Sequence, residues 1–271
     1  MRIGNRVFDV ENKGYIMGIL NVTPDSFSDG GRFNCLDKAL RHCEEMINEG
    51  ADIIDIGGES TRPGYTKISD EEETERVCPV IEGIKSRFDI PVSVDTYKSK
   101  VAEEALLSGA DLINDVWGLK YDGKMAEVIK KYNVPSVLMH NRKEAVYNSF
   151  VDDVVSDLRE SLEIAERAGI ERGKIILDPG VGFGKDYKQN LTIIRELDRL
   201  KIFGLPVLLG TSRKSVIGLT LNLPADERVE GTTATTVLGV IKGAAFFRVH
   251  DVKANRRALL MTEAILKNGL N

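Results

Sequence analysis

The 271-residue sequence has few of the features that mark secreted, membrane-embedded or nucleic-acid-binding proteins. It has only three cysteines, Cys35, Cys43 and Cys78, too few and too scattered for a disulfide framework or a zinc site. No stretch approaches the ~18 uninterrupted apolar residues of a membrane-spanning helix, and the polar N-terminus lacks the apolar segment of a signal peptide. A formal net charge of -5 argues against a broad nucleic-acid footprint. We therefore expect a cytoplasmic protein with neither a membrane nor a nucleic acid as partner.

Short apolar runs instead alternate with amphipathic stretches along the whole chain. The runs consist mostly of Val, Ile and Leu, a composition typical of parallel strands that are buried on both faces. They cover residues 15–20, 53–56, 92–94, 112–113, 136–139, 175–177, 207–209 and 245–249. Apolar residues at helical spacing predict helices over residues 37–50, 72–88, 151–168, 189–200, 227–241 and 254–266.

Strand–helix units that follow one another without a linker predict one closed (β/α)8 TIM barrel over residues 1–271. The length agrees, because such a barrel uses about 250 residues. An open, doubly wound sheet is the alternative. Residues 3–10 alternate polar and apolar side chains before the first barrel strand, which predicts a short hairpin that plugs the floor of the barrel.

Polar side chains follow the predicted strands, at the end where barrel enzymes build their active sites. They include Asn21, Thr61, Arg62, Asp95, Asn114, His140, Asp178, Lys214, Arg248 and His250. Asp95, Asn114 and Asp178 supply the carboxylates and the amide that would read the amino and amide edges of a flat nitrogen heterocycle. Arg62, Arg248 and His250, with Arg213 and Lys214, supply cationic donors for an anion such as a phosphate group. We therefore expect one pocket with a heterocycle at its floor and a phosphate at its rim.

Other polar positions have simpler interpretations. Asp55 and Asp115 lie at strand ends and are interpreted as structural residues. Gly180, Gly182 and Gly184 do not have the spacing of a dinucleotide-binding or phosphate-binding loop. They predict a loop with positive φ angles next to a ligand.

Several long segments together resemble the dihydropteroate synthase family, the folate-pathway enzymes inhibited by sulfonamides. The similar segments are MGILNVTPDSFSDGG (17–31), ADIIDIGGESTRPG (51–64), VSVDTYK (92–98), INDVWG (113–118), LDPGVGFGK (177–185), LLGTSRKSVIG (208–218) and RVHDV (248–252). The resemblance covers nearly the whole chain. It implies a single pterin-binding barrel domain, a homodimer, and a transferase that condenses 6-hydroxymethyl-7,8-dihydropterin diphosphate with 4-aminobenzoate to give 7,8-dihydropteroate and pyrophosphate.

The resemblance also implies a role for each matching residue. The pterin would be held by Asp95, Asn114, Asp178 and Lys214, with Met139 and Phe183 packed near it. The diphosphate would be bound by Arg62, Arg248 and His250, with Asn21 near it and near a Mg²⁺ ion. The aminobenzoate pocket would be bordered by Thr61, Pro63, Ser215 and Phe33.

Diphosphate is a good leaving group once its charge is neutralised, so the chemistry favours a dissociative path through a pterin cation. Direct displacement is the alternative mechanism.

Two alternative functions remain: a pterin-binding methyltransferase on the same barrel, and a non-catalytic pterin-binding protein. The residues proposed for the diphosphate argue against the methyltransferase, which would not need them.

Overall fold

The structure is a computed structural model, and it describes residues 1–22, 32–59 and 67–268. Within them, eight parallel strands pair in the order β8-β7-β6-β5-β4-β3-β10-β9, and a parallel bridge between Leu177 and Val207 joins the two ends of the sheet. The predicted (β/α)8 barrel is thereby confirmed, and the open sheet is wrong. The strands are β3 (Tyr15–Asn21), β4 (Ile53–Gly57), β5 (Val92–Asp95), β6 (Leu112–Asp115), β7 (Ser136–Met139), β8 (Ile175–Asp178), β9 (Leu208–Leu209) and β10 (Phe246–Val249).

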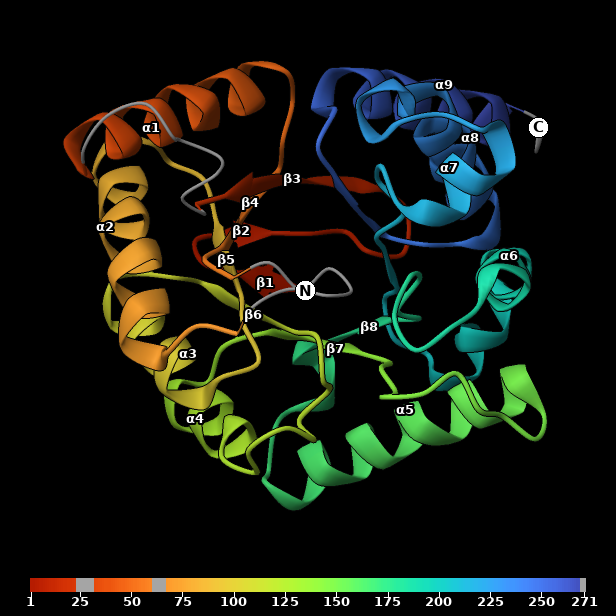
Figure 1. The fold of residues 1–271 in the computed structure, drawn as a ribbon, viewed down its shortest axis with the longest axis horizontal. Helices are drawn as coiled ribbons and strands as arrows, with labels where there is room; N and C mark the ends of the chain where they lie inside the picture. The colour runs from red at the N-terminus through yellow and green to blue at the C-terminus, as the bar shows by residue number, and fades with distance from the viewer. Residues whose placement is uncertain (23–31, 60–66, 269–271) are drawn as a thin grey trace.

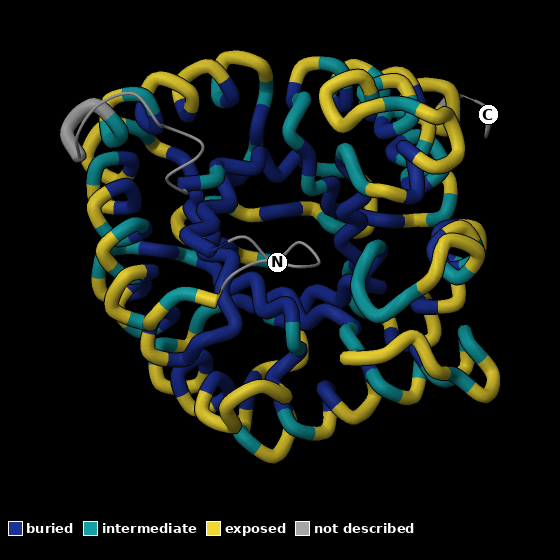
Figure 2. Tube along the Cα trace, in the orientation of Figure 1, coloured by how far each residue is buried: buried dark blue, intermediate teal, exposed yellow. Residues whose placement is uncertain are grey.

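Helices form an outer ring around these strands (Figure 1). Their inward faces are buried and their outward faces exposed, while the strands are buried almost throughout (Figure 2). The α-helices are α1 (Arg32–Asn48), α2 (Asp70–Arg87), α3 (Ser99–Leu107), α4 (Met125–Tyr132), α5 (Phe150–Arg167), α6 (Tyr187–Arg195), α7 (Ser215–Leu221), α8 (Val229–Lys242) and α9 (Val252–Asn268). Short 3-10 helices cover Arg172–Lys174, Leu197–Phe203 and Ala225–Glu227.

The local sequence explains how several helices begin. Ser69 caps α2 by accepting a hydrogen bond from the backbone N–H of Glu72, and acidic residues fill the first turn, where the helix dipole favours negative charge. Asp186 and Gln189 form a reciprocal capping box at the start of α6. None of the described helices combines the length and the apolar character needed to cross a membrane.

A small antiparallel hairpin precedes the barrel, as predicted. Its strands, β1 (Arg2–Ile3) and β2 (Arg6–Val7), pair Arg2 with Val7. Ile3 and Phe8 are buried against one residue from each of seven barrel strands: Met17, Ile53, Leu112, Val137, Ile176, Leu208 and Phe246. The hairpin therefore packs beneath the first interior layer of the barrel and plugs its floor.

The alternation of side chains along each strand then places the polar residues. Because Ile53, Leu112, Ile176 and Phe246 belong to the interior floor layer, residues two positions further along those strands face inward again. Those residues are Asp55, Asn114, Asp178 and Arg248. A polar layer thus lies directly above an apolar one, at the carboxyl end of the barrel.

Candidate active site

Arg248 lies at the centre of the polar layer and contacts two carboxylates from other strands. Its Nε donates to Asp55 Oδ2 at 2.5 Å, and its second terminal nitrogen donates to Asp95 Oδ2 at 2.6 Å. Asn114 Nδ2 donates to the same oxygen of Asp55 at 3.2 Å. Residues from β4, β5, β6 and β10 are therefore joined into one hydrogen-bonded cluster inside the barrel.

The carboxylates of this cluster retain unused acceptors. Burial raises the pKa of Asp95, and the neighbouring Arg248 opposes that rise. Oδ1 of Asp95 and Oδ1 of Asp55 are buried, and within the described part of the chain no group donates a hydrogen bond to either. A buried acceptor without a donor costs free energy, so these oxygens suit a ligand that brings N–H groups.

Asp178 and Lys214 form the second half of the layer. Asp178 Oδ1 accepts a hydrogen bond from the backbone N–H of Gly180 at 2.7 Å. A Cβ atom placed on Gly210 would lie 3.9 Å from Asp178 Oδ2 and 3.8 Å from both Lys214 Nζ and Arg248 Cβ, so these three side chains converge above one glycine. Burial raises the pKa of Asp178, against the attraction of Lys214, and burial lowers the pKa of Lys214 to about 8.

An apolar wall lies beside the carboxylates. Met139, Tyr97 and Val116 form a buried cluster, and Trp117 and Phe183 pack against it. Lys214 donates a hydrogen bond to the carbonyl of Val181, and its Nζ lies 4.8 Å from the centroid of the Phe183 ring. The wall provides the apolar surfaces that a flat heterocycle needs, next to the polar groups that would read its edges.

The rim holds the remaining predicted residues that the structure describes. Asn21 ends β3, and its Oδ1 lies 3.5 Å from the position of a Cβ atom on Gly57. His250 Nδ1 lies 3.0 Å from Ser212 Oγ, and Ser215 is exposed at the start of α7. Arg213, expected among the anion-binding cations, pairs with Asp251 through contacts of 2.5 and 3.0 Å. Its assignment to an anion stays a prediction.

Some predicted residues cannot be placed. Thr61, Arg62 and Pro63, and the side chain of Phe33, lie outside what the structure describes. The remaining ten predicted residues lie at the carboxyl ends of the strands, in the loops that follow them or, for Ser215, at the start of α7. Their assignment to pterin, diphosphate and aminobenzoate stays a prediction.

Sequence reasoning gave no role to Lys185. Asp55, interpreted as structural, is fully buried and accepts a hydrogen bond from Arg248, which agrees with that interpretation. Asp115 agrees with its structural interpretation, because it accepts hydrogen bonds from the backbone N–H groups of Trp117 and Leu119. Lys185, which ends the glycine-rich loop, donates to backbone carbonyls within that loop.

Comparison with known proteins gives one consistent result. The sequence profile of the pterin binding enzyme family matches residues 17–250. A dihydropteroate synthase from Clostridium beijerinckii is 59% identical over 268 residues, which cover 98% of this chain and 100% of that protein. One from Bacillus subtilis is 56% identical over 259 residues, covering 96% and 91% of the two chains.

Solved structures agree. A dihydropteroate synthase from Clostridium difficile, crystallised in the presence of pteroic acid, has a TM-score of 0.94 and 53% identity, covering 96% of this chain and 99% of that one. The Yersinia pestis enzyme in a sulfonamide drug complex has a TM-score of 0.92 and 42% identity, covering 98% and 99%.

Proposed function

The chain belongs to the dihydropteroate synthase family of pterin-binding enzymes, and from that premise we propose how its own residues carry out the reaction. The reaction condenses 6-hydroxymethyl-7,8-dihydropterin diphosphate with 4-aminobenzoate, giving 7,8-dihydropteroate and pyrophosphate. The observation that carries the proposal is the cluster in which Asp95, Asn114 and Arg248 meet above a sealed apolar floor.

The pterin ring occupies the polar layer, with its amino-pyrimidine edge toward Asp95, Asn114 and Asp178. Support comes from the buried Oδ1 of Asp95, which lacks a donor within the described chain, and from the second oxygen of Asp178, which faces Gly210. The ring faces lie against the wall formed by Met139 and Phe183. Lys214 donates to the ring from the side of Gly210.

Bond breaking precedes bond making in this proposal. The C–O bond between the pterin methylene and the diphosphate breaks, and its electron pair leaves with the diphosphate. The methylene cation that results is delocalised into the ring, where the carboxylates of Asp95 and Asp178 stabilise its charge. The amine nitrogen of 4-aminobenzoate then donates its lone pair to the methylene carbon and afterwards loses a proton. Since the arylamine attacks a cation, no strong protein base is required. Direct displacement is the competing path.

Cationic groups hold the leaving group. Arg248 lies in β10 and His250 directly follows that strand. We assign both, with Arg62, to the diphosphate. Thr61, Pro63, Ser215 and Phe33 are assigned to the aminobenzoate. Of these seven residues, Arg248, His250 and Ser215 have side chains that the structure describes.

A Mg²⁺ ion fits the rim. The described residues contain no group of three or more His, Cys, Asp or Glu side chains that could hold a metal by themselves. Mg²⁺ is usually bound by one or two protein oxygens, substrate phosphates and water, and the Asn21 side chain at the end of β3 supplies such an oxygen. When bound there with the diphosphate, the ion neutralises charge on the leaving group.

The enzyme is proposed to form a homodimer through the outer surface of α7, α8 and α9, which overlap in Figure 1 and of which α8 contacts both of the others. Large apolar side chains are exposed there: Leu219, Ile241, Met261 and Ile265. A second copy of the chain would cover them. Met261→Glu is expected to shift the molar mass measured by light scattering toward that of the monomer.

A cytoplasmic location is proposed because a pterin diphosphate is too highly charged to cross a membrane unaided.

Pyrophosphate release tests the function directly. Enzyme with both substrates should release pyrophosphate and form dihydropteroate in equal amounts. Release with the pterin diphosphate alone would indicate hydrolysis, and no release with both substrates would leave a pterin-binding protein without this activity.

Asp95→Asn, which keeps the side chain's shape and removes its charge, is expected to lower kcat more than it raises KM for the pterin if the carboxylate stabilises the cation.

A further inference from the structure

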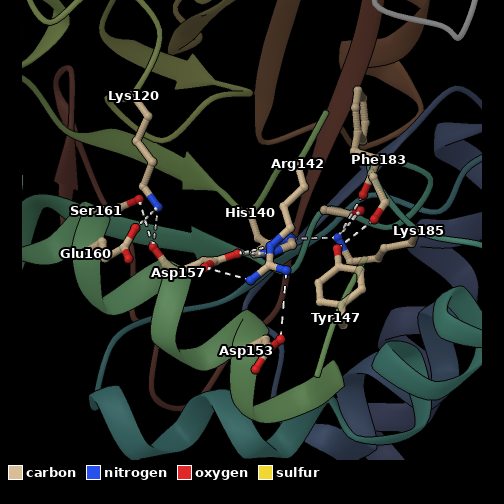
Figure 3. Close-up of polar contacts among 12 residues, drawn as sticks. Lys120, His140, Arg142, Tyr147, Asp153, Asp157, Glu160, Ser161, Phe183 and Lys185 are labelled. Atoms are coloured by element: carbon tan, nitrogen blue, oxygen red, sulfur yellow. Dashed lines mark hydrogen bonds and ion pairs between the residues drawn. The ribbon is translucent and has the colours of Figure 1, made fainter. Parts of the chain in front are cut away.

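We infer that Lys185, held by His140 and Asp157, is a positioning residue for pterin binding, because it fixes the loop that carries Phe183 into the site. The inference rests on the proposed function. It concerns residues that do not face the substrate: they lie behind the loop after β8, between that loop and helix α5 (Figure 3).

Lys185 is the central member of this group. Its Nζ lies 2.9 Å from the carbonyl oxygens of both Gly180 and Phe183, and 2.7 Å from Nδ1 of His140. A protonated lysine has three N–H donors, and here it has three acceptors. Two of the contacts join the beginning and the end of the same short loop, so a single side chain fixes the shape of that loop.

His140 is held in one orientation by partners on both ring nitrogens. Nδ1 accepts from Lys185, which leaves Nε2 as the donor to Asp157 Oδ2 at 2.9 Å. The histidine side chain is fully buried, and burial lowers its pKa to about 4, so the imidazole is neutral at physiological pH and keeps this donor–acceptor pattern.

Asp157 connects the group to α5. Besides His140, it accepts hydrogen bonds from Nε of Arg142 at 2.6 Å and from a terminal nitrogen of Arg142 at 3.1 Å. Although burial alone would raise the pKa of Asp157, the hydrogen bonds from His140 and Arg142 hold it below its usual range. The aspartate is thus ionised and supplies a fixed negative charge near Lys185, whose pKa burial lowers to about 7 against the attraction of Asp178 and Asp157.

The loop itself can follow this path only because of its glycines. Gly180, Gly182 and Gly184 have φ angles of 69°, 87° and 53°, as the sequence predicted. A Cβ atom on Gly180 would lie 1.9 Å from the carbonyl oxygen of His140, so the loop is pressed against the end of β7. Glycine backbone is also intrinsically free, and side chains outside the loop must therefore fix it.

The contacts that fix the loop also set the substrate-facing groups. The N–H of Gly180, whose carbonyl Lys185 holds, donates to Asp178. The carbonyl of Phe183 is held by Lys185, and the Phe183 ring lies beside Lys214. Displacement of the loop would move one carboxylate and one aromatic ring of the pterin site together, without touching the groups assigned to aminobenzoate.

Steady-state kinetics of Lys185→Met, which removes the donors and keeps much of the side chain's length, tests the inference. We expect KM for the pterin diphosphate to rise at least tenfold, while KM for aminobenzoate changes by less than threefold. Lys188→Met, at an exposed lysine on the following helix α6, is the matched control and should match wild type. A variant that merely folds poorly would lose kcat, because fewer molecules are active, with KM unchanged; that result would overturn the inference.

His140 provides an independent variant pair. Gln has an acceptor oxygen and a donor nitrogen that can replace the two ring nitrogens, whereas Leu has neither. His140→Gln should keep KM for the pterin within threefold of wild type, and His140→Leu should raise it as Lys185→Met does. Equal KM values for the two variants would overturn the role of the hydrogen-bond chain. Absence of turnover in the wild-type enzyme would instead contradict the proposed function, so the two failures are distinguishable.

Discussion

Arg248 and Asp55 are 193 positions apart in the chain and 2.5 Å apart in the barrel. The aspartate side chain is fully buried, and its other oxygen has no donor among the described residues, so the arginine provides its charge compensation. Asp95 depends on the same guanidinium. One cation on the last strand thus pairs with two carboxylates at the floor of the proposed pterin site.

Loss of this cation should be costly for folding. Arg248→Met is expected to lower the free energy of unfolding by about 3–5 kcal/mol, because it leaves uncompensated buried charge. Urea-induced unfolding measures the loss, and Arg257→Met, at an exposed arginine on α9, is the control that should change it by less than about 0.5 kcal/mol. A loss below about 1 kcal/mol for Arg248→Met would mean that the carboxylates are protonated or hydrated.

Arg248 was also assigned to the diphosphate, and ligand binding separates the two roles. If the guanidinium binds the leaving group, Arg248→Met should weaken pyrophosphate binding far more than binding of a pterin that lacks the diphosphate. Calorimetric titration of the two ligands gives this comparison. Equal losses for both would restrict Arg248 to holding Asp55 and Asp95 in place.

The pterin-reading assignment of Asp178 can be tested in the same way. Asp178→Ala removes one partner of a buried, charge-assisted hydrogen bond, which should cost about 2–5 kcal/mol of pterin binding. Asp186→Ala changes an exposed aspartate eight positions later, at the start of α6, and should bind the pterin as wild type does. The assignment is wrong if Asp178→Ala binds the pterin within threefold of wild type.

Binding of aminobenzoate is expected to depend on the anion. The segments at 21–36 and 60–71, which follow the first two barrel strands, contain Asn21, Phe33, Thr61, Arg62 and Pro63. If the diphosphate completes the aminobenzoate pocket, pyrophosphate with Mg²⁺ should tighten aminobenzoate binding at least about tenfold, a coupling of ~1.4 kcal/mol. Arg62→Ala should abolish the coupling and leave pterin binding largely intact. Equal affinity with and without pyrophosphate would show a pocket formed in advance.

His140 predicts how stability depends on pH. Burial lowers its pKa to about 4, whereas the unfolded chain binds that proton near pH 6.5. Between these values the unfolded state holds more protons, so stability falls as the pH falls, by about 3 kcal/mol between pH 7 and pH 4. His140→Gln should lack this contribution, and the difference between its unfolding free energy and that of wild type should vary with pH in this window. His42→Gln, on an exposed face of α1, controls for loss of a histidine as such.

The sequence alone predicted the barrel because its strands are buried on both faces and therefore consist of unusually uniform apolar runs. Helices α3, α4 and α7 were not predicted, because they are only 9, 8 and 7 residues long and the N-cap residue of each makes no side-chain hydrogen bond that caps the helix. Such short helices owe their stability to the strands on which they pack.

The sequence predicted that polar residues gather at the carboxyl ends of the strands, but it did not predict which of them pair. A polar residue that follows a buried apolar run is easy to recognise in the sequence. The neighbouring residues do not indicate, however, that Arg248 reaches across the barrel to Asp55 rather than pointing to the rim. The glycines of the 180–184 loop predicted positive φ angles, which the structure confirms. That Lys185 holds this loop depends on His140 and Asp157, from two other elements, and no spacing in the sequence records that contact.

The hairpin beneath the barrel gives the barrel one closed end. Ile3 and Phe8 close its lower end, and substrates and products share the upper opening. In the proposed arrangement the pterin ring lies on the polar layer, below the aminobenzoate, so we expect the pterin to enter before the aminobenzoate. Pyrophosphate, which is released nearer the opening, can leave before dihydropteroate. The pterin ring is therefore expected to be the first group to enter the site and the last to leave it.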